Sequence, residues 1–284
     1  MLKLQGTGVA LITPFKENKS IDFPGLEKLI EHVIIGGVDY LVVAGTTAES
    51  ATLTKNEKKE VLDACIKYNA GRLPIVYGLG GNNTHAILDD IKDTDFSQID
   101  AVLSVSPFYN KPTQAGIIAH YRAIADNCPV PVILYNVPGR TMSNVSFQST
   151  IQLSHHANII GMKEASGDLS QCMRIAARMP DDFLLISGDD ILTPSMRVIG
   201  GKGVISVLAN AYPEIFKTIC HGNLKESKEA AFKLLDINPL MYEESNPVGL
   251  KFLMKELGIC GDTVRLPLLP ASQSLRERIK QLKL

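Results

Sequence analysis

The chain has 284 residues, of which 45% are hydrophobic and 21% are charged, a composition typical of a folded protein with a large core. Its 29 Lys and Arg residues nearly balance its 30 Asp and Glu residues, so no charge excess indicates nucleic acid as a partner. No apolar run is long enough to span a membrane, and the first residues lack the apolar core of a signal peptide. Five scattered cysteines without a CxxC pair argue against a disulfide framework and a zinc site. We therefore expect a protein of the reducing cytoplasm that binds neither nucleic acid nor membrane.

Apolar runs of strand length alternate with segments of helical periodicity over the first 221 residues. The predicted strands are 8–13, 40–44, 73–77, 101–105, 130–135, 158–163, 183–187 and 203–207. The first predicted helix spans 21–37, and the second starts after Thr54, where Glu57 completes a capping box. The later helices of this part are predicted over 84–93, 113–126, 146–155, 168–178, 191–199 and 213–221.

This alternation predicts an α/β fold, a (β/α)8 TIM barrel, rather than an open sheet. No glycine-rich dinucleotide-binding motif follows the first strand, which argues against a nucleotide-binding sheet. Three further helices, over 223–235, 247–257 and 272–284, have no strands between them. We predict a barrel over residues 1–222 that carries the active site, and a C-terminal helical extension over residues 223–284 that packs on it.

A lysine closes the sixth predicted strand. The apolar run from Asn158 leads directly to Lys163, at the barrel face where active sites lie. Burial disfavours the charged form of an amine, and a neutral amine is a nucleophile. A strand-end lysine can also simply extend to solvent. We interpret Lys163 as a lysine that forms a Schiff base.

Other predicted strand ends supply groups suited to the same chemistry. Tyr135 ends the neighbouring fifth strand and could move the protons that imine formation requires. The hydroxyl and backbone N–H groups of Thr46 and Thr47 could hold a carboxylate. Arg140 offers two parallel donors for a second carboxylate. Taken together, these groups predict a site that binds a keto acid, forms an imine and receives another acidic substrate.

Each of these residues alone has a structural interpretation. The two threonines could shape a turn, the tyrosines could be half-buried core residues, and Arg140 could be an ordinary surface arginine. For Asp189 and Asp190, after the seventh strand, we favour capping of the following helix. The functional interpretation depends on several strand ends supplying groups for one reaction.

Three motifs together resemble the dihydrodipicolinate synthase / N-acetylneuraminate lyase family, whose members are barrels that form a Schiff base with pyruvate. These motifs are Gly45-Thr-Thr-Ala-Glu-Ser50, Tyr135-Asn-Val-Pro-Gly-Arg140 and Gly161-Met-Lys-Glu-Ala-Ser166. The resemblance covers nearly the whole chain. It is closest to members that condense pyruvate with L-aspartate 4-semialdehyde on the route to diaminopimelate and lysine.

The resemblance implies that Lys163 forms the imine with pyruvate, so that no separate cofactor is needed. It implies a proton relay of Tyr135, Thr47 and Tyr109, in which Tyr109 reaches a neighbouring subunit of a homotetramer built as a dimer of dimers. The substrate-binding residues that it implies are Thr46 and Thr47 for the pyruvate carboxylate, Arg140 for the semialdehyde carboxylate, and Gly188 and the backbone of Ile205 in the pocket wall.

The sequence departs from the family pattern at several positions. Ala48 stands where glycine is usual, directly after the threonine pair. In members inhibited by lysine, histidines stand at the positions of Lys55 and Lys58. An acidic residue lies near the position of His85, and a tyrosine stands at that of Phe108. Extra cations and a missing carboxylate should repel a cationic effector, so we expect weak or absent inhibition by lysine.

Two alternatives remain open from the sequence. Another pyruvate-dependent aldolase of the family, such as N-acetylneuraminate lyase or a 2-keto-3-deoxy sugar acid aldolase, would share the lysine and the tyrosine. Arg140 argues for an acidic aldehyde over a sugar, because a sugar site needs groups that pair with hydroxyls. A catalytically silent barrel that senses a keto acid is the other alternative, since a fold does not specify a function.

Overall fold

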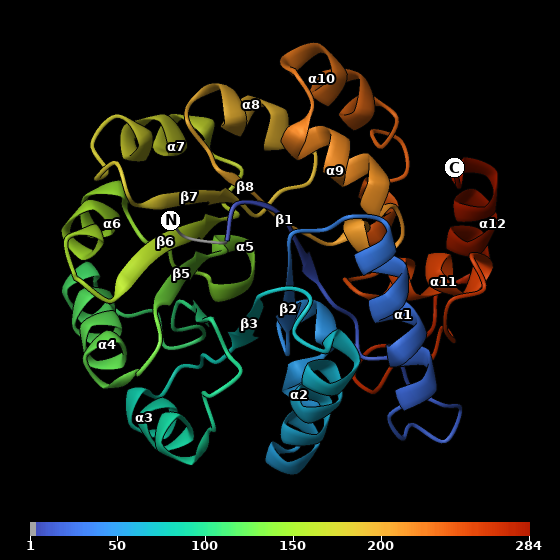
Figure 1. Ribbon diagram of the computed structural model, residues 1–284, viewed down its shortest axis with the longest axis horizontal. Coiled ribbons are helices and arrows are strands. Elements are labelled where there is room, and N and C mark those ends of the chain that lie inside the picture. The colour runs from blue at the N-terminus through green and yellow to red at the C-terminus, as the bar shows by residue number, and fades with distance from the viewer. Residues whose placement is uncertain (1–3) are drawn as a thin grey trace.

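Eight short parallel strands close into a barrel, each strand bonded to the next and β8 to β1 (Figure 1). The structure is a computed structural model that describes residues 4–284. Residues 1–3 lie outside the described residues, and they include the start of the segment that we expect not to be a signal peptide. The strands are β1 (Gly6–Ala10), β2 (Tyr40–Val43), β3 (Ile75–Gly78), β4 (Ala101–Val105), β5 (Val132–Asn136), β6 (Ile159–Glu164), β7 (Leu184–Ser187) and β8 (Gly203–Ser206). The predicted barrel is confirmed.

Eight helices surround the barrel and cover the outer face of the strands (Figure 1). They are α1 (Phe23–Ile35), α2 (Lys55–Asn69), α3 (Thr84–Asp93), α4 (Gln114–Asn127), α6 (Phe147–Ser154), α7 (Leu169–Ala176), α8 (Thr193–Val198) and α9 (Pro213–His221). The capping box predicted at the start of α2 is present, with Thr54 and Glu57 each bonded to the other's backbone N–H. Short helical turns that the sequence patterns do not predict follow several strands: η1 (Thr46–Ala48), η2 (Ser50–Thr52), α5 (Pro138–Thr141) and η3 (Leu208–Asn210).

Alternation along the strands divides the apolar residues into two cores. Val42, Ile133 and Ile186 belong to a cluster inside the barrel, whereas Leu41 and Leu134 belong to the larger cluster between the strands and the helices. Both faces of each strand are therefore buried, which explains why the strands are continuous apolar runs rather than alternating ones.

The first strand lies earlier than predicted, at Gly6–Ala10 instead of 8–13. Its pairing with β2 ends at Ala10 and its pairing with β8 at Val9. Leu11 makes one more bond to β2, from its N–H to the carbonyl of Val42 at 3.0 Å. The following residues stay buried but leave the sheet, and the N–H of Ile12 donates to the side chain of Asn210 at 3.2 Å. An apolar run indicates which residues are buried, but only part of this run is paired with neighbouring strands.

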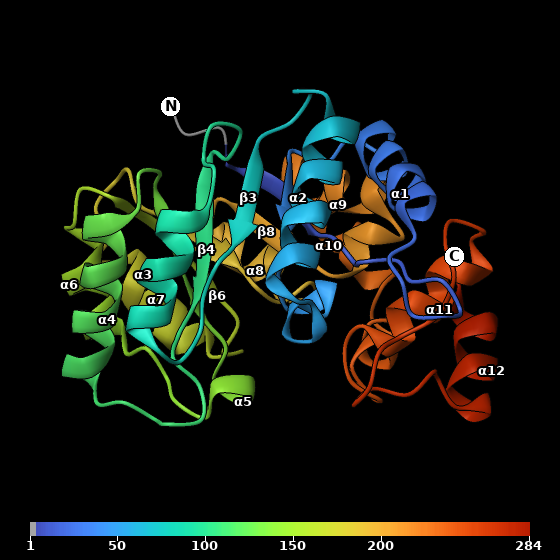
Figure 2. The ribbon, with the colours of Figure 1, turned by 90° about the horizontal axis from the view of Figure 1, so that it is seen from below.

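The chain continues beyond the barrel as α10 (Leu224–Phe232), η4 (Pro239–Met241), α11 (Val248–Glu256) and α12 (Gln273–Leu282). Helix α10 packs against α8 and α9, and α11 packs against α12. Figure 2 shows α11 and α12 beside the barrel, toward the end at which α5 follows β5. The carboxyl ends of the strands lie at that end, so these helices stand next to the region where barrel active sites form. No helix within residues 4–284 has the length and apolarity to cross a membrane.

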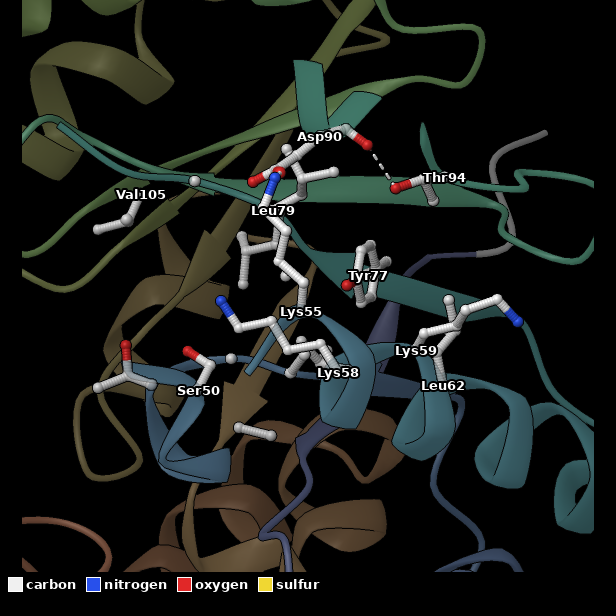
Figure 3. Close-up of a pocket in the computed structure, with 18 of the residues that line it drawn as sticks. Ser50, Lys55, Lys58, Lys59, Leu62, Tyr77, Leu79, Asp90, Thr94 and Val105 are labelled. Atoms are coloured by element: carbon white, nitrogen blue, oxygen red, sulfur yellow. Dashed lines mark hydrogen bonds and ion pairs between the residues drawn. The ribbon is translucent and has the colours of Figure 1, made fainter. Parts of the chain in front are cut away.

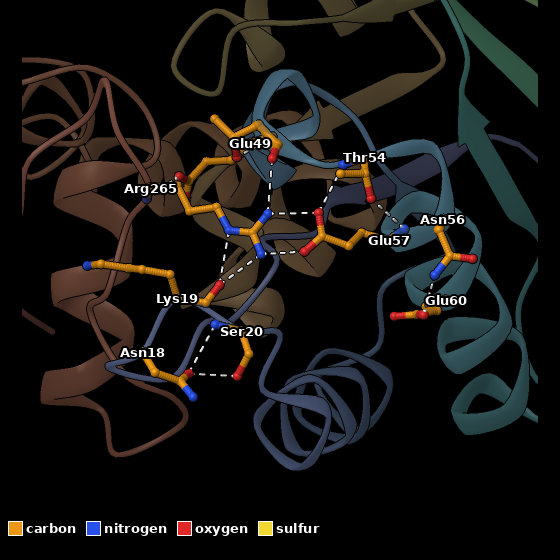
Figure 4. Close-up of polar contacts among 10 residues, drawn as sticks. Asn18, Lys19, Ser20, Glu49, Thr54, Asn56, Glu57, Glu60 and Arg265 are labelled. Carbon is orange, nitrogen blue, oxygen red and sulfur yellow. Dashed lines mark hydrogen bonds and ion pairs between the residues drawn. The ribbon is translucent and has the colours of Figure 1, made fainter.

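Arg265 ties this C-terminal region to the loops at the carboxyl ends of the strands (Figure 4). Its guanidinium donates two hydrogen bonds to the carboxylate of Glu57 on α2, at 2.9 and 2.5 Å. It also donates to the backbone carbonyls of Lys19 and Thr52. The backbone N–H of Arg265 donates to Glu49 at 2.9 Å. The guanidinium lowers the pKa of Glu57 to about 2.

A second link is a buried ion pair. The Lys251 ammonium on α11 lies 2.6 Å from the Glu49 carboxylate, and both side chains are at most 2% exposed. Lys251 also donates to the carbonyl of Thr263 at 2.9 Å and lies over the ring of Phe15. Removing either partner of a buried pair leaves an uncompensated charge, which costs about 3–5 kcal/mol. The segment after η1 is therefore firmly attached to the C-terminal region.

We predict that Glu57→Gln lowers the free energy of unfolding by about 2 kcal/mol at pH 7, allowing for the partial exposure of the pair. Because the carboxyl pKa falls from 4.5 to about 2 on folding, the stabilisation is complete above pH 4.5 and is lost as the pH falls toward 2. Denaturant unfolding should show about the same difference from wild type at pH 7 and pH 5, and a clearly smaller difference at pH 3.5. Glu60→Gln, on the exposed side of the same helix, is the control and should change stability little. An equal difference at every pH would contradict this account.

Candidate active site

Lys163 and Tyr135 lie side by side inside the barrel. They are paired residues of β6 and β5, and the Lys163 amine lies 4.4 Å from the centroid of the Tyr135 ring. Lys163 is 5% exposed and Tyr135 is 8% exposed. The adjacency that strand order predicts is therefore present, and both side chains are buried.

A bulge in β6 sets the direction of Lys163. Val132 of β5 pairs with Ile159, but the next residue pairs with Gly161, so Ile160 is an extra residue in the strand. Ile160 packs with the inner cluster and Met162 belongs to the outer one. Strict alternation from Ile160 would turn Met162 inward and Lys163 toward the helices. The inserted residue reverses this and aims Lys163 into the barrel, as bulges near active sites do.

Glycine is required at the bulge. A Cβ at Gly161 would lie 2.6 Å from the carbonyl oxygen of Leu184 on β7, closer than van der Waals contact allows. The apolar periodicity of this strand does not predict the bulge, although a glycine inside a strand run is a signal for one.

Glu164, the residue after Lys163, is a second buried polar group, and no sequence pattern indicates its role. It is 3% exposed and points to the helix layer. Its carboxylate accepts hydrogen bonds from Asn136 at 3.0 Å, from Gln171 of α7 at 2.8 Å and from the N–H of Ser166 at 2.7 Å. Glu164 therefore secures the ends of β5 and β6 to α7 and leaves the barrel interior to Lys163.

The threonine pair borders the same cavity as the lysine. A cavity of about 580 Å³ is lined at its inner end by Thr46, Thr47, Tyr135, Lys163 and Ile205. Thr46 and Thr47 begin the turn η1 directly after β2. Five of the eight predicted site residues thus meet in one space.

The other three predicted residues lie outside the inner wall of that cavity. Arg140 is exposed on the short helix α5, which begins two residues after β5. Tyr109 follows β4 with a left-handed backbone (φ 71°) and is 86% exposed. Gly188 follows β7, where a Cβ would lie 2.5 Å from that of Ala165. The glycine therefore allows the end of β7 to approach the chain just beyond Lys163.

The prediction that the two aspartates after β7 cap the following helix is wrong, because the N-cap residue of α8 is Leu192 and no side chain caps this helix. Asp189 accepts hydrogen bonds from the N–H groups of Ile191 and Leu192, at 3.0 and 3.1 Å, in the turn that precedes the helix. Asp190 does not cap: it is 2% exposed and accepts from the N–H of Leu208 after β8 at 2.9 Å. Burial raises the pKa of Asp190 to about 6. A pattern of two aspartates does not distinguish a helix cap from a carboxylate that closes a turn or joins two loops.

Ala48 occupies its turn without strain. The residue is 1% exposed, and it is not among the residues with positive φ. Its N–H donates to the carbonyl of Gly45 at 3.2 Å. The methyl group is therefore buried in a position that does not require glycine.

The outer part of the cavity opens between α2 and α3 (Figure 3). Lys55 and Lys58 line it from α2, and Asp90 lines it from α3. The Lys55 ammonium lies 2.6 Å from the Asp90 carboxylate, and this hydrogen bond raises the pKa of Lys55. Within residues 4–284, no cluster of three or more His, Cys, Asp or Glu residues could hold a metal ion.

Comparison with known proteins agrees with this geometry. Residues 3–283 match the model of the dihydrodipicolinate synthetase family. The 4-hydroxy-tetrahydrodipicolinate synthase of Cytophaga hutchinsonii is 50% identical over 280 residues, which cover 97% of this chain and 94% of that protein. A solved monomeric dihydrodipicolinate synthase variant superposes with a TM-score of 0.95 at 34% identity, covering 99% of this chain and 96% of that one. The enzyme from Cyanidioschyzon merolae with lysine bound superposes with a TM-score of 0.95 at 35% identity, covering 99% and 98%.

Proposed function

The chain belongs to the dihydrodipicolinate synthetase family, and from that membership we propose how its own residues carry out the reaction. The activity is the condensation of pyruvate with L-aspartate 4-semialdehyde, named in its relatives as 4-hydroxy-tetrahydrodipicolinate synthase. The observation that supports the mechanism best is the buried Lys163 amine, 4.4 Å from the Tyr135 ring centroid, in the cavity that the threonine pair borders.

The first stage is an imine between Lys163 and pyruvate. The amine of Lys163 attacks the keto carbon and a C–N bond forms. The nitrogen gives up its two hydrogens as protons, and the keto oxygen takes up two protons and leaves as water. Tyr135 supplies and removes protons in these steps. The hydroxyl and N–H groups of Thr46 and Thr47 hold the carboxylate, which keeps the keto carbon near Lys163. Gly188 and the backbone of Ile205 form part of the pocket wall. The covalent lysine adduct takes the place of a separate cofactor.

The second stage joins the two substrates. Loss of a proton from the methyl group of the imine gives an enamine, whose carbon attacks the aldehyde, and the aldehyde oxygen takes a proton. The amino group of the semialdehyde then displaces Lys163 from the former keto carbon. This closes the ring and frees the lysine. Arg140 binds the semialdehyde carboxylate, a role supported by its exposed position on the turn after β5.

We also propose that the protein works as a homotetramer, a dimer of dimers, in which Tyr109 enters the site of a neighbouring copy and completes a relay with Thr47 and Tyr135. An aromatic side chain that is 86% exposed on a left-handed backbone supports this role. Exposure of an aromatic ring to water is unfavourable, and a neighbouring copy that covers Tyr109 would remove that cost. The barrel, over residues 1–222, carries these groups, and residues 223–284 form the extension.

We predict that Lys163→Ala abolishes turnover and leaves the fold intact, because the site loses its nucleophile but no packing partner of the outer core. Borohydride reduction with pyruvate should add one covalent adduct to the wild-type chain, and peptide mass spectrometry should map it to Lys163. The variant should show none. An adduct on another lysine, or none on the wild type, would refute the mechanism.

Arg140→Ala should raise the KM for aspartate semialdehyde by about 10- to 100-fold, the effect expected for losing charged hydrogen bonds. The KM for pyruvate should change by less than about threefold. Arg140→Lys, which keeps the charge but not the paired donors, should fall between the two. A rise in the KM for pyruvate alone would contradict this role of Arg140.

We expect weak or absent inhibition by lysine. The enzyme of Cyanidioschyzon merolae is known with lysine bound. In this chain, Lys55 and Lys58 line the outer cavity, and Lys55 already forms an ion pair with Asp90. A third ammonium would be repelled. Initial rates should stay within about 20% of the uninhibited value up to millimolar lysine. Strong inhibition at micromolar concentrations would contradict this.

A further inference from the structure

The C-terminal region contacts the candidate proton relay directly, at Thr47. Asn246 lies in the loop between η4 and α11. Its side-chain Nδ2 donates to the Thr47 hydroxyl oxygen at 2.9 Å, between residues 199 positions apart in the sequence. Asn246 is 6% exposed and Thr47 is 3% exposed. Because the bond is shielded from water, it holds the hydroxyl in one orientation.

The direction of this bond fixes what the hydroxyl can do. An amide N–H only donates, so the Thr47 oxygen is the acceptor. A hydroxyl has one proton, and that proton remains free to be donated to another group. We propose that Asn246 is a positioning residue that makes Thr47 present its proton to the reaction site. The proposal rests on the relay role of Thr47 given above.

Thr47 and Asn246 both stand next to unusual backbone. Glu49, two residues after Thr47, has a left-handed backbone with φ of 55°, and Ser245, directly before Asn246, has φ of 76°. Such conformations are unfavourable for residues other than glycine and persist only where surrounding contacts impose them. At Glu49, the buried pair with Lys251 and the bond from the N–H of Arg265 supply these contacts. The turn and the loop therefore meet in a fixed geometry.

The side-chain oxygen of Asn246 does not explain why an asparagine stands at this position. Its side-chain Oδ1 is buried and has no hydrogen-bond partner within the described residues. A buried oxygen without a partner is destabilising, so an apolar residue would suit this position better if packing alone mattered. What the asparagine provides is its bond to Thr47, which agrees with a role in the reaction rather than in the fold.

Asn246→Asp tests this directly, because the new side chain has almost the same size but its carboxylate can only accept. Thr47 would then donate its proton to Asp and away from the site. We expect kcat to fall by about tenfold or more, within the range that proton-transfer groups contribute. The KM for pyruvate should stay within about threefold. Protonation of the new carboxyl restores a donor, so activity relative to wild type should recover as the pH is lowered.

Two comparisons separate positioning from a structural effect. In a Thr47→Val background, Asn246→Asp should change kcat by less than about twofold, because no hydroxyl remains to be oriented. Asn69→Asp is the matched control: Asn69 is a buried asparagine at the end of α2 whose amide donates to the carbonyl of Leu73 at 2.7 Å. That variant should lower stability and leave kcat unchanged.

The inference is overturned if Asn246→Asp keeps wild-type kcat, or if it loses the same factor with and without the Thr47 hydroxyl. If the aspartate variant fails to fold, Asn246→Ala, which removes the donor without adding a charge, is measured in the same two backgrounds and judged by the same criteria. Wild-type enzyme that forms no pyruvate adduct at Lys163 would instead contradict the proposed function, so the two failures are distinguishable.

Discussion

The register between β5 and β6 is the constraint on which the site depends. Tyr135 pairs with Lys163 only because Ile160 is an extra residue in β6. If the same residues from Ile159 to Lys163 ran without a bulge, the alternation of the strand would place the lysine among the helices and Met162 in the barrel. Gly161 permits the bulge because Leu184 of the next strand leaves no room for a Cβ. One inserted residue and one glycine thus convert an apolar strand into the carrier of an inward-facing amine.

The barrel carries the proposed reacting groups, and the C-terminal region holds some of them in place. Arg265, Lys251 and Asn246 reach the segment that follows β2 through a guanidinium, a buried ammonium and an amide. All three contacts fall between Thr47 and Glu57, and Figure 4 shows those of Arg265. The extension therefore stabilises the threonine turn. Without these contacts, the turn would be held mainly by its chain connections to β2 and α2.

Most of the strands and helices of the barrel could be predicted from the sequence. A strand buried on both faces is an apolar run in the sequence, and several helices begin at recognisable capping residues. The neighbourhood of Lys163 and Tyr135 followed from strand order alone. The bulge did not, because periodicity over six residues does not resolve one inserted position. Asn246 could not be found either: it lies in an irregular loop 199 residues from Thr47, and no local pattern encodes that contact. The burial of Asp190 likewise depends on the loop after β8.

The central claim is that the inward-facing lysine bonds covalently to pyruvate while the threonine turn holds its carboxylate. A crystal structure of the enzyme reduced with borohydride in the presence of pyruvate tests it most directly. The account predicts continuous density from Nζ of Lys163 to the former keto carbon, with the carboxylate against the hydroxyl and N–H groups of Thr46 and Thr47. Pyruvate bound elsewhere, or density that ends at Nζ, would contradict it.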